Sequence, residues 1–145
     1  VADLNIKSSK LQGVELDKEI AKLMIDEYPI LSVAASFAES PSIFRGLKEL
    51  KIKESNRLEL IYINLLKCGV SCEVKNDDLY IYPNKEYTIK DSNIITKFDH
   101  RIAMAFSVMG TRLNENLKIL ESECISTSFP NFSKNFNSVG GQLIE

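Results

Sequence analysis

The order of strand-like and helix-like segments constrains the fold of this chain most, because the same order begins twice. The first half predicts a strand, a helix, a strand, a helix and then a hairpin of two strands. Near residue 86 the alternation restarts, and the second half follows the same order over a shorter length. The sequence therefore predicts an α/β (α+β) protein built from repeated βαβαββ units, one at 1–85 and an incomplete one at 86–145.

Apolar periodicity and turn residues place the elements of both units. In the first unit we expect helices at 30–38 and 53–69, and strands at 4–11, 42–46, 70–74 and 79–82. In the second unit we expect helices at 99–110 and 128–139, and strands at 87–90, 117–120 and 143–144. Residues 14–22 are polar and ambiguous, so they stay unassigned.

The segment 30–38 is apolar nearly all round, which is typical of a buried helix rather than a surface one. Its alanines allow close packing against a sheet. Asp26 and Pro29 precede it, and together they suit a helix entry, with Asp26 as a candidate N-cap and Pro29 in the first turn.

Length and composition indicate one globular domain. The chain has 145 residues, of which 44% are hydrophobic, and this is enough to bury a core. The net charge of -2 gives no bulk electrostatic reason to expect a nucleic acid or an anionic membrane as partner. The longest apolar run, 30–38, is far too short to span a bilayer. Three cysteines and one histidine predict reduced thiols in the cytoplasm rather than disulfides or a zinc site.

A charged stretch stands at the expected start of the helix at 53–69. Lys53, Glu54 and Arg57 are spaced so that their side chains would share one side of the first helical turn. A helix N-terminus beside two cations can hold a small anion, and a carboxylate there is either an ion-pair partner or an acid–base catalyst. The alternative is a solvated face with weak ion pairs, which is common at helix starts.

Four segments, in this order and at this spacing, resemble one family. They are LMIDEYP at 23–29, ELKIKESNR at 49–57, DHRIAMA at 99–105 and CISTSFPNF at 124–132. Together they are similar to the C-terminal part of the EPSP synthase (3-phosphoshikimate 1-carboxyvinyltransferase) family. Each of the two domains in that family holds three βαβαββ units. The resemblance therefore implies that residues 1–145 are a partial C-terminal domain, with about two of its three units.

The resemblance implies an enolpyruvyl transferase of the shikimate pathway, which serves aromatic amino acid biosynthesis. Such an enzyme moves the enolpyruvyl group of phosphoenolpyruvate to the 5-hydroxyl of shikimate 3-phosphate and releases phosphate, with no cofactor or metal. By motif position, Asp26 would be the base and Glu54 the proton donor. Asp26 and Lys53 would bind shikimate 3-phosphate. Arg57 and Arg101 would hold the phosphoenolpyruvate carboxylate, a task that suits a planar guanidinium group.

Three residues keep alternative roles. Asp26 fits a helix cap as well as a base. Glu54 lies between two cations and is expected to stay ionised, which conflicts with proton donation until an anionic substrate binds. His100 could adjust the neighbouring Arg101 or cap the helix that begins there.

The chain departs from the family pattern at several positions. Asn56 stands where aspartate is common, and Thr127 stands where a lysine often contacts phosphoenolpyruvate. Ser40 replaces a turn glycine, and Glu49 falls where some members use asparagine. No counterpart of the N-terminal domain is present, and in the family that domain supplies the remaining phosphate ligands. We therefore expect this chain to be an inactive fragment without that partner.

Two other functions stay open. A UDP-N-acetylglucosamine 1-carboxyvinyltransferase shares the fold, but its pattern lacks the paired Lys-Glu and the Asp-His-Arg. A non-catalytic remnant of the same fold is the other, and the departures at Asn56 and Thr127 allow it. A basic RNA-binding face is disfavoured, because glutamates interleave with the cations of residues 48–59.

Overall fold

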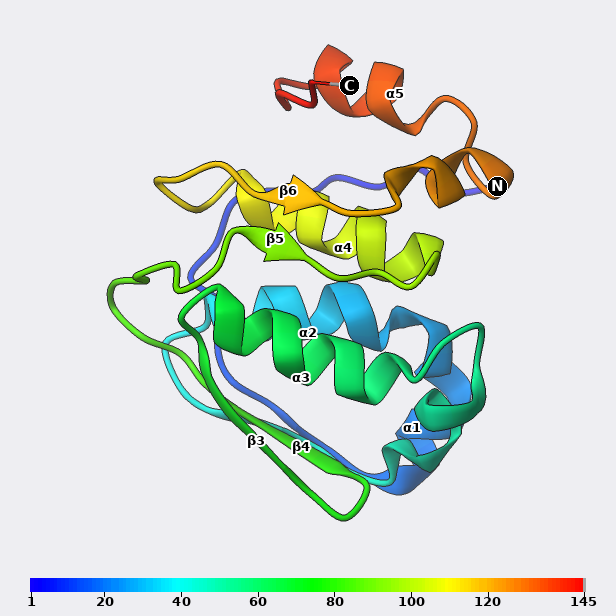
Figure 1. The fold of residues 1–145 in the computed structure, drawn as a ribbon. Helices are drawn as coiled ribbons and strands as arrows, with labels where there is room; N and C mark the ends of the chain where they lie inside the picture. The colour runs from blue at the N-terminus through cyan, green and yellow to red at the C-terminus, as the bar shows by residue number, and fades with distance from the viewer. Residues whose placement is uncertain (145) are drawn as a thin grey trace.

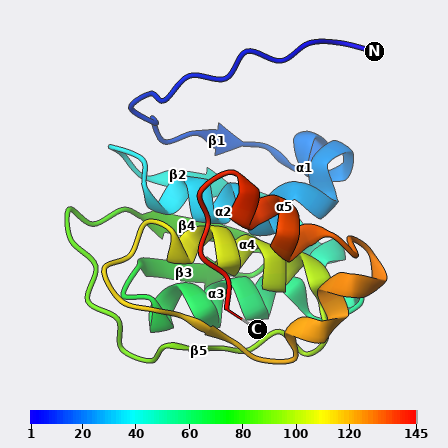
Figure 2. The same cartoon turned by 90° about the horizontal axis from the view of Figure 1, so that it is seen from above.

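Three helices form the inner layer of the fold. The computed structural model describes residues 1–144, and in it α2 (Tyr28–Ser36), α3 (Arg57–Lys67) and α4 (His100–Gly110) lie side by side (Figure 1). A four-stranded sheet packs against α2 and α3, while a two-stranded sheet packs against α3 and α4 (Figure 1, Figure 2). The helices therefore lie between the two sheets. Among the described residues, no helix combines the length and apolar composition that crossing a membrane requires.

Residues 15–82 form one βαβαββ unit. β1 (Glu15–Leu16) and β2 (Ser42–Phe44) run parallel, and the chain between them passes through α1 (Lys18–Met24), the 3₁₀ turn η1 (Ile25–Glu27) and α2. A parallel pair needs such a crossover. The 3₁₀ helix η2 (Leu47–Ile52), α3 and the hairpin of β3 (Ser71–Lys75) and β4 (Asp78–Tyr82) follow. β4 pairs antiparallel with both β2 and β3, which gives the order β1-β2-β4-β3.

The later residues begin the same order again. β5 (Asn93–Ile94) and β6 (Lys118–Ile119) are parallel, and α4 lies between them in the chain. The 3₁₀ helix η3 (Ser122–Thr127) and α5 (Phe132–Ser138) follow, at the end of the molecule away from β3 and β4 (Figure 1). This order agrees with the predicted restart, and the boundary between units near residue 86 stays a prediction.

The buried face of each inner helix follows its apolar residues. α3 buries Leu58, Ile61 and Leu65, which recur every three or four positions. α2 buries most of its length, with Pro29 in its first turn, so the predicted buried helix is confirmed. Arg57, at the start of α3, is among the largest fully buried side chains. A buried charge of this size needs buried partners.

The strand predicted at 4–11 is wrong. Residues 1–14 contain no strand, and the side chains of Leu4 and Ile6 are 84% and 87% exposed. Alternating apolar residues form a stable strand only beside a partner, and no strand of the described residues pairs with this segment. The edge strand is β1, within the ambiguous stretch 14–22, and it pairs with Ile43 and Phe44. Residues 87–90 and 143–144 are likewise outside any strand.

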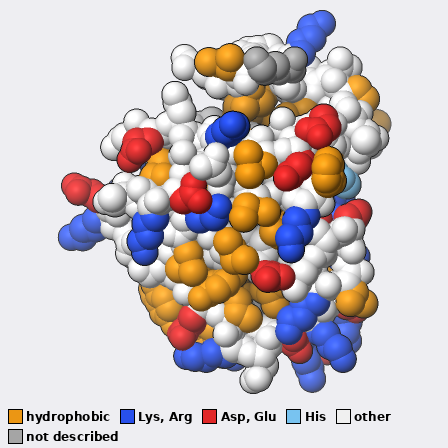
Figure 3. Space-filling view, viewed as in Figure 1, with side chains coloured by type: hydrophobic (Ala, Val, Ile, Leu, Met, Phe, Trp, Pro, Cys, Tyr) orange, Lys and Arg blue, Asp and Glu red, His pale blue; other side chains and the backbone are white. Residues whose placement is uncertain are grey.

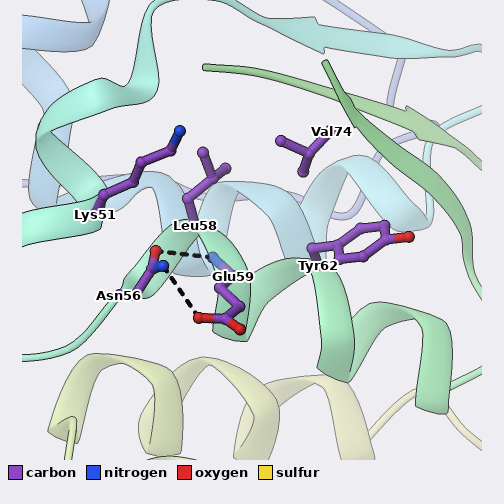
Figure 4. Close-up of a pocket in the computed structure, with 6 residues that line it drawn as sticks. All are labelled: Lys51, Asn56, Leu58, Glu59, Tyr62 and Val74. Carbon is purple, nitrogen blue, oxygen red and sulfur yellow. Dashed lines mark hydrogen bonds between the residues drawn. The ribbon is translucent and has the colours of Figure 1, made fainter. Parts of the chain in front are cut away.

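The helix predicted to start at Lys53 begins at Arg57. The side chain of Asn56 accepts a hydrogen bond from the backbone N–H of Glu59 at 3.2 Å and donates one to its carboxylate at 3.0 Å (Figure 4). This reciprocal cap sets the helix start, so Lys53 and Glu54 lie in the bend between η2 and α3. Asn56, a departure from the family pattern, therefore serves as the N-cap.

Asp26 is not a helix cap. It lies inside η1, and its side chain makes no cap hydrogen bond for η1 or α2. The aspartates that cap helices are Asp17, at the start of α1, and Asp99, at the start of α4. The helix predicted at 128–139 is shorter, because η3 and a turn precede α5.

Candidate functional site

The candidate site is centred on the guanidinium group of Arg57, whose side chain is fully buried. Its Nε donates to Oδ2 of Asp99 and its Nη1 donates to Oδ1 of Asp26, both at 2.8 Å. Its Nη2 donates to Oε2 of Glu54. Three carboxylates therefore surround one cation, and other cations must balance the excess negative charge.

Lys53 and Arg101 supply positive charge next to Asp26. Nζ of Lys53 lies 3.5 Å from Oδ1 of Asp26, and Nη2 of Arg101 lies 3.8 Å from Oδ2. Nη1 of Arg101 also donates to the backbone carbonyl of Asp26 at 3.0 Å and to the Glu27 carboxylate at 3.3 Å. Asp26 is thus shared by cations from the bend before α3, from α3 and from α4.

The structure brings together the five side chains that the sequence analysis took from separate motifs. The exposed fraction rises from 0% for Arg57 through 28% for Lys53, 33% for Arg101 and 41% for Asp26 to 53% for Glu54. The cluster is therefore a buried guanidinium group with a partly open rim of carboxylates and cations. The part that each residue takes in binding or catalysis stays a prediction.

The surroundings keep Asp26 and Arg57 charged. Burial by itself would raise the pKa of Asp26, but Arg101, Lys53 and Arg57 together lower that pKa below its ordinary value. Burial by itself would lower the pKa of Arg57, yet the hydrogen bond and charge of Asp99, with Glu54 and Asp26, raise it. Without ligand, Asp26 is therefore ionised at neutral pH and is a weak base.

Asp26→Asn is expected to reduce the acid dependence of stability. Folding lowers the pKa of Asp26 below its ordinary value of 3.8, so ionised Asp26 stabilises the fold fully at a pH above 3.8. This stabilisation is lost as the pH falls through the lower pKa of the folded state. Urea unfolding from about pH 6 down to about pH 2 measures the effect. The free energy of unfolding should fall less with acid in the variant than in the wild type. Parallel acid dependence in the two proteins would contradict the argument.

Asp99 and Ser55 also belong to the cluster, although neither was predicted from the sequence as a site residue. The Asp99 side chain is fully buried, and Ser55 Oγ donates to its Oδ2 at 2.8 Å. The sequence indicated Asp99 only as the start of a helix. Its partner Arg57 lies 42 residues earlier in the chain, a separation that no local pattern can bridge.

His100 and Thr127 stand outside these contacts. Within the described residues the His100 side chain makes no hydrogen bond, and Asp99 caps α4, so the capping role considered for His100 is wrong. Oγ1 of Thr127 donates to the backbone carbonyl of Cys124 at 2.7 Å. Thr127 therefore closes a turn of η3. Glu49, in η2, is exposed.

A surface hollow adjoins the charged cluster. It has a volume of about 220 Å³, begins at Asp26, Glu27 and Arg101, and continues over apolar residues of α2, α4 and α5. Another hollow, of about 170 Å³, lies beside the Asn56 cap of α3 and contains none of the five side chains (Figure 4). On the face seen in Figure 3, basic side chains gather at the lower right with acidic ones among them, and elsewhere acidic and basic side chains are interspersed around apolar ones.

The fold is that of an α/β domain found in solved EPSP synthases. An EPSP synthase structure from Acinetobacter baumannii matches with a TM-score of 0.83 and 32% identity, and the match covers 92% of this chain and 31% of that one. A second structure of EPSP synthase from the same organism matches with a TM-score of 0.81 and 29% identity, covering 94% of this chain and 32% of that one.

Sequence comparison leads to the same family. The EPSP synthase (3-phosphoshikimate 1-carboxyvinyltransferase) family model matches residues 2–136, and the chain belongs to this family. A 3-phosphoshikimate 1-carboxyvinyltransferase from Paramagnetospirillum magneticum is 46% identical over 99% of this chain, and one from Methylorubrum extorquens is 41% identical over 99%. The chain spans about a third of the length of these relatives, because it covers 32% of each.

Proposed function

We propose that this chain is part of a 3-phosphoshikimate 1-carboxyvinyltransferase. Such an enzyme transfers the enolpyruvyl group of phosphoenolpyruvate to the 5-hydroxyl of shikimate 3-phosphate and releases phosphate. One observation carries the proposal: in a chain of this family, Asp26, Lys53, Glu54 and Arg101 form a partly open rim around the buried guanidinium group of Arg57. Both substrates are anions, and the rim combines guanidinium and ammonium groups with carboxylates suited to proton transfer.

Arg57 and Arg101 would bind the carboxylate of phosphoenolpyruvate. In the ligand-free chain, Nη1 and Nη2 of Arg57 face the partly exposed carboxylates of Asp26 and Glu54. A substrate carboxylate can therefore replace Glu54 at Nη2, while the buried contact between Arg57 and Asp99 persists. Arg101, one-third exposed, offers a second planar group of donors beside it.

Asp26 and Lys53 would bind the ring hydroxyls of shikimate 3-phosphate. The 5-hydroxyl oxygen then attacks the central carbon of phosphoenolpyruvate and gives its proton to Asp26. Because three cations lower the pKa of Asp26, its basicity depends on substrate drawing some of that charge away. The weak basicity of the ligand-free site thus fits an enzyme that becomes active only when both substrates are bound.

Glu54 would give a proton to the methylene carbon, which becomes a methyl group and completes a tetrahedral ketal. In the elimination, Glu54 would take a proton back from this methyl group, and phosphate would leave with the proton held by Asp26, which forms the product. In the ligand-free chain Glu54 pairs with Arg57. A bound substrate carboxylate would take that position, so that Arg57 would no longer hold the Glu54 side chain.

The remaining two-thirds of the protein would supply the other phosphate ligands and close over this half-site. We therefore expect the 145-residue chain alone to show no transferase activity. The test is a chimera in which this chain replaces the matching segment of the Paramagnetospirillum magneticum relative. Phosphate release should require both phosphoenolpyruvate and shikimate 3-phosphate, and UDP-N-acetylglucosamine should not replace the latter.

Two results would contradict the proposal. Turnover by the isolated chain would show that the residues of this chain are sufficient for transferase activity without the rest of the protein. A chimera that folds but releases no phosphate would favour a non-catalytic module.

The cytoplasmic location expected from the cysteine content stays a prediction.

A further inference from the structure

The Asp99 carboxylate joins three parts of the candidate site. Its Oδ2 accepts hydrogen bonds from Arg57 Nε and from Ser55 Oγ, both at 2.8 Å. Its Oδ1 accepts from the backbone N–H of Arg101 at 3.0 Å and of Ile102 at 3.4 Å. With a side-chain exposure of 0%, it is shielded from solvent and from any ligand. One carboxylate thus fixes the bend before α3, the Arg57 side chain and the start of α4.

The contacts of Arg57 divide into a buried one and two that face the rim. Asp99 occupies Nε from the interior, whereas Nη1 and Nη2 contact Asp26 and Glu54, which are 41% and 53% exposed. A guanidinium group binds a carboxylate through two neighbouring nitrogens. Since Nε is held inside, a ligand can reach the Nη1–Nη2 edge only by displacing the partly exposed carboxylates of Asp26 and Glu54.

We infer that Asp99 is the positioning residue that holds Arg57 by its Nε so that the Nη1–Nη2 edge faces the rim. Because the same carboxylate caps α4, it also sets the start of the helix that carries Arg101. Asp99 therefore holds the Arg57 guanidinium group directly and fixes the backbone position from which the Arg101 side chain extends. That Arg57, held in this way, binds a substrate carboxylate rests on the proposed function. The contact between Asp99 and Arg57 Nε can be tested without that function.

The test is the exchange of the Arg57 Nε–H proton with water, followed by NMR in the full 145-residue chain. Asp99→Asn keeps a good helix cap but replaces the buried charge that accepts from Nε. Exchange of this proton should be about tenfold faster or more in the variant. Asp17→Asn is the matched control, because Asp17 caps α1 through Glu19 N and Ile20 N but holds no arginine. It should leave the Arg57 exchange unchanged.

A milder variant covers the case in which Asp99→Asn does not fold. Ser55→Ala removes one hydrogen bond to Oδ2 and should speed Arg57 exchange by a smaller factor while the fold persists. Unchanged exchange in the folded variants would overturn the inference. A loss of protection confined to the amides of Arg101 and Ile102 would also overturn it, because Asp99 would then be a helix cap only.

A phosphoenolpyruvate titration of the same samples keeps the two proposals apart. If the wild-type chain binds this ligand, Asp99→Asn should weaken binding about tenfold, and equal binding would overturn the positioning role. If the wild-type chain shows no shift of the Arg57 or Arg101 signals, the titration is repeated with the chimera, and no binding there counts against the binding role in the proposed function. The exchange experiment then decides the inference by itself.

Discussion

Arg57→Met is expected to destabilise the chain by about 3–5 kcal/mol, because it leaves a buried carboxylate without its partner. Arg57 and Asp99 both have fully buried side chains and pair at 2.8 Å. Methionine fills much of the same volume, so the loss should come mainly from uncompensated charge rather than from a cavity. Urea unfolding at pH 7 gives the change in the free energy of unfolding.

Arg45→Met is the control for this experiment. Arg45 also pairs with two carboxylates, those of Glu15 and Asp78, but its side chain is 40% exposed. Solvent can replace those partners, so the loss should be far smaller. The double variant Arg57→Met with Asp99→Asn should be more stable than the sum of the single losses predicts, because no buried charge is left unpaired. Additive losses, or equal losses for Arg45 and Arg57, would contradict this account.

The elements that were predicted correctly are those whose cap and turn residues lie close in sequence to the element itself. Asp99 indicated the start of α4, and its side chain does accept from the N–H groups of the first turn. The hairpin of β3 and β4 also follows from local pattern, because polar turn residues separate two short segments of strand-like sequence. In both cases the interactions that stabilise the element are local.

One error arose where a strand needs a distant partner, and the other arose where several neighbouring positions compete as a helix start. The alternation of residues 4–11 is a strand pattern, but no strand lies beside it among the described residues. The charged run from Lys53 to Arg57 suits a helix start equally well at several positions. The reciprocal cap of Asn56 and Glu59 selects Arg57, and the polar residues before it turn towards Asp26 and Asp99 instead.

The candidate site was predictable only in part. Family resemblance, and not periodicity, grouped Asp26 and Arg101 with the charged stretch, and the structure places them within ion-pair distance of each other. Family resemblance identifies the residues of a motif but not the neighbouring residues that hold them in position. The Arg57–Asp99 pair and the Ser55–Asp99 hydrogen bond, which span 42 and 44 residues, became visible only once α3 and α4 were packed together.

Glu54→Gln is expected to lower kcat of the active chimera by about 10²–10⁴-fold, because glutamine cannot give a proton to the methylene carbon. The KM for phosphoenolpyruvate should stay unchanged or fall, since the variant removes the charged group that competes for Arg57 Nη2. The fold should persist, because the Glu54 side chain is 53% exposed. Steady-state kinetics measure the first two effects, and urea unfolding of the isolated chain measures the third.

Glu59→Gln is the control variant. It distinguishes proton donation by Glu54 from the general effect of removing a carboxylate near α3. Glu59 is an exposed residue in the first turn of the same helix, and it pairs with the Asn56 cap rather than with Arg57. Because glutamine can also complete a capping box, this variant should keep the kcat of the chimera. If both variants keep full activity, Glu54 is only an ion-pair partner of Arg57, and another group must protonate the methylene carbon. If Glu54→Gln instead raises KM at constant kcat, Glu54 contributes to binding and not to proton transfer.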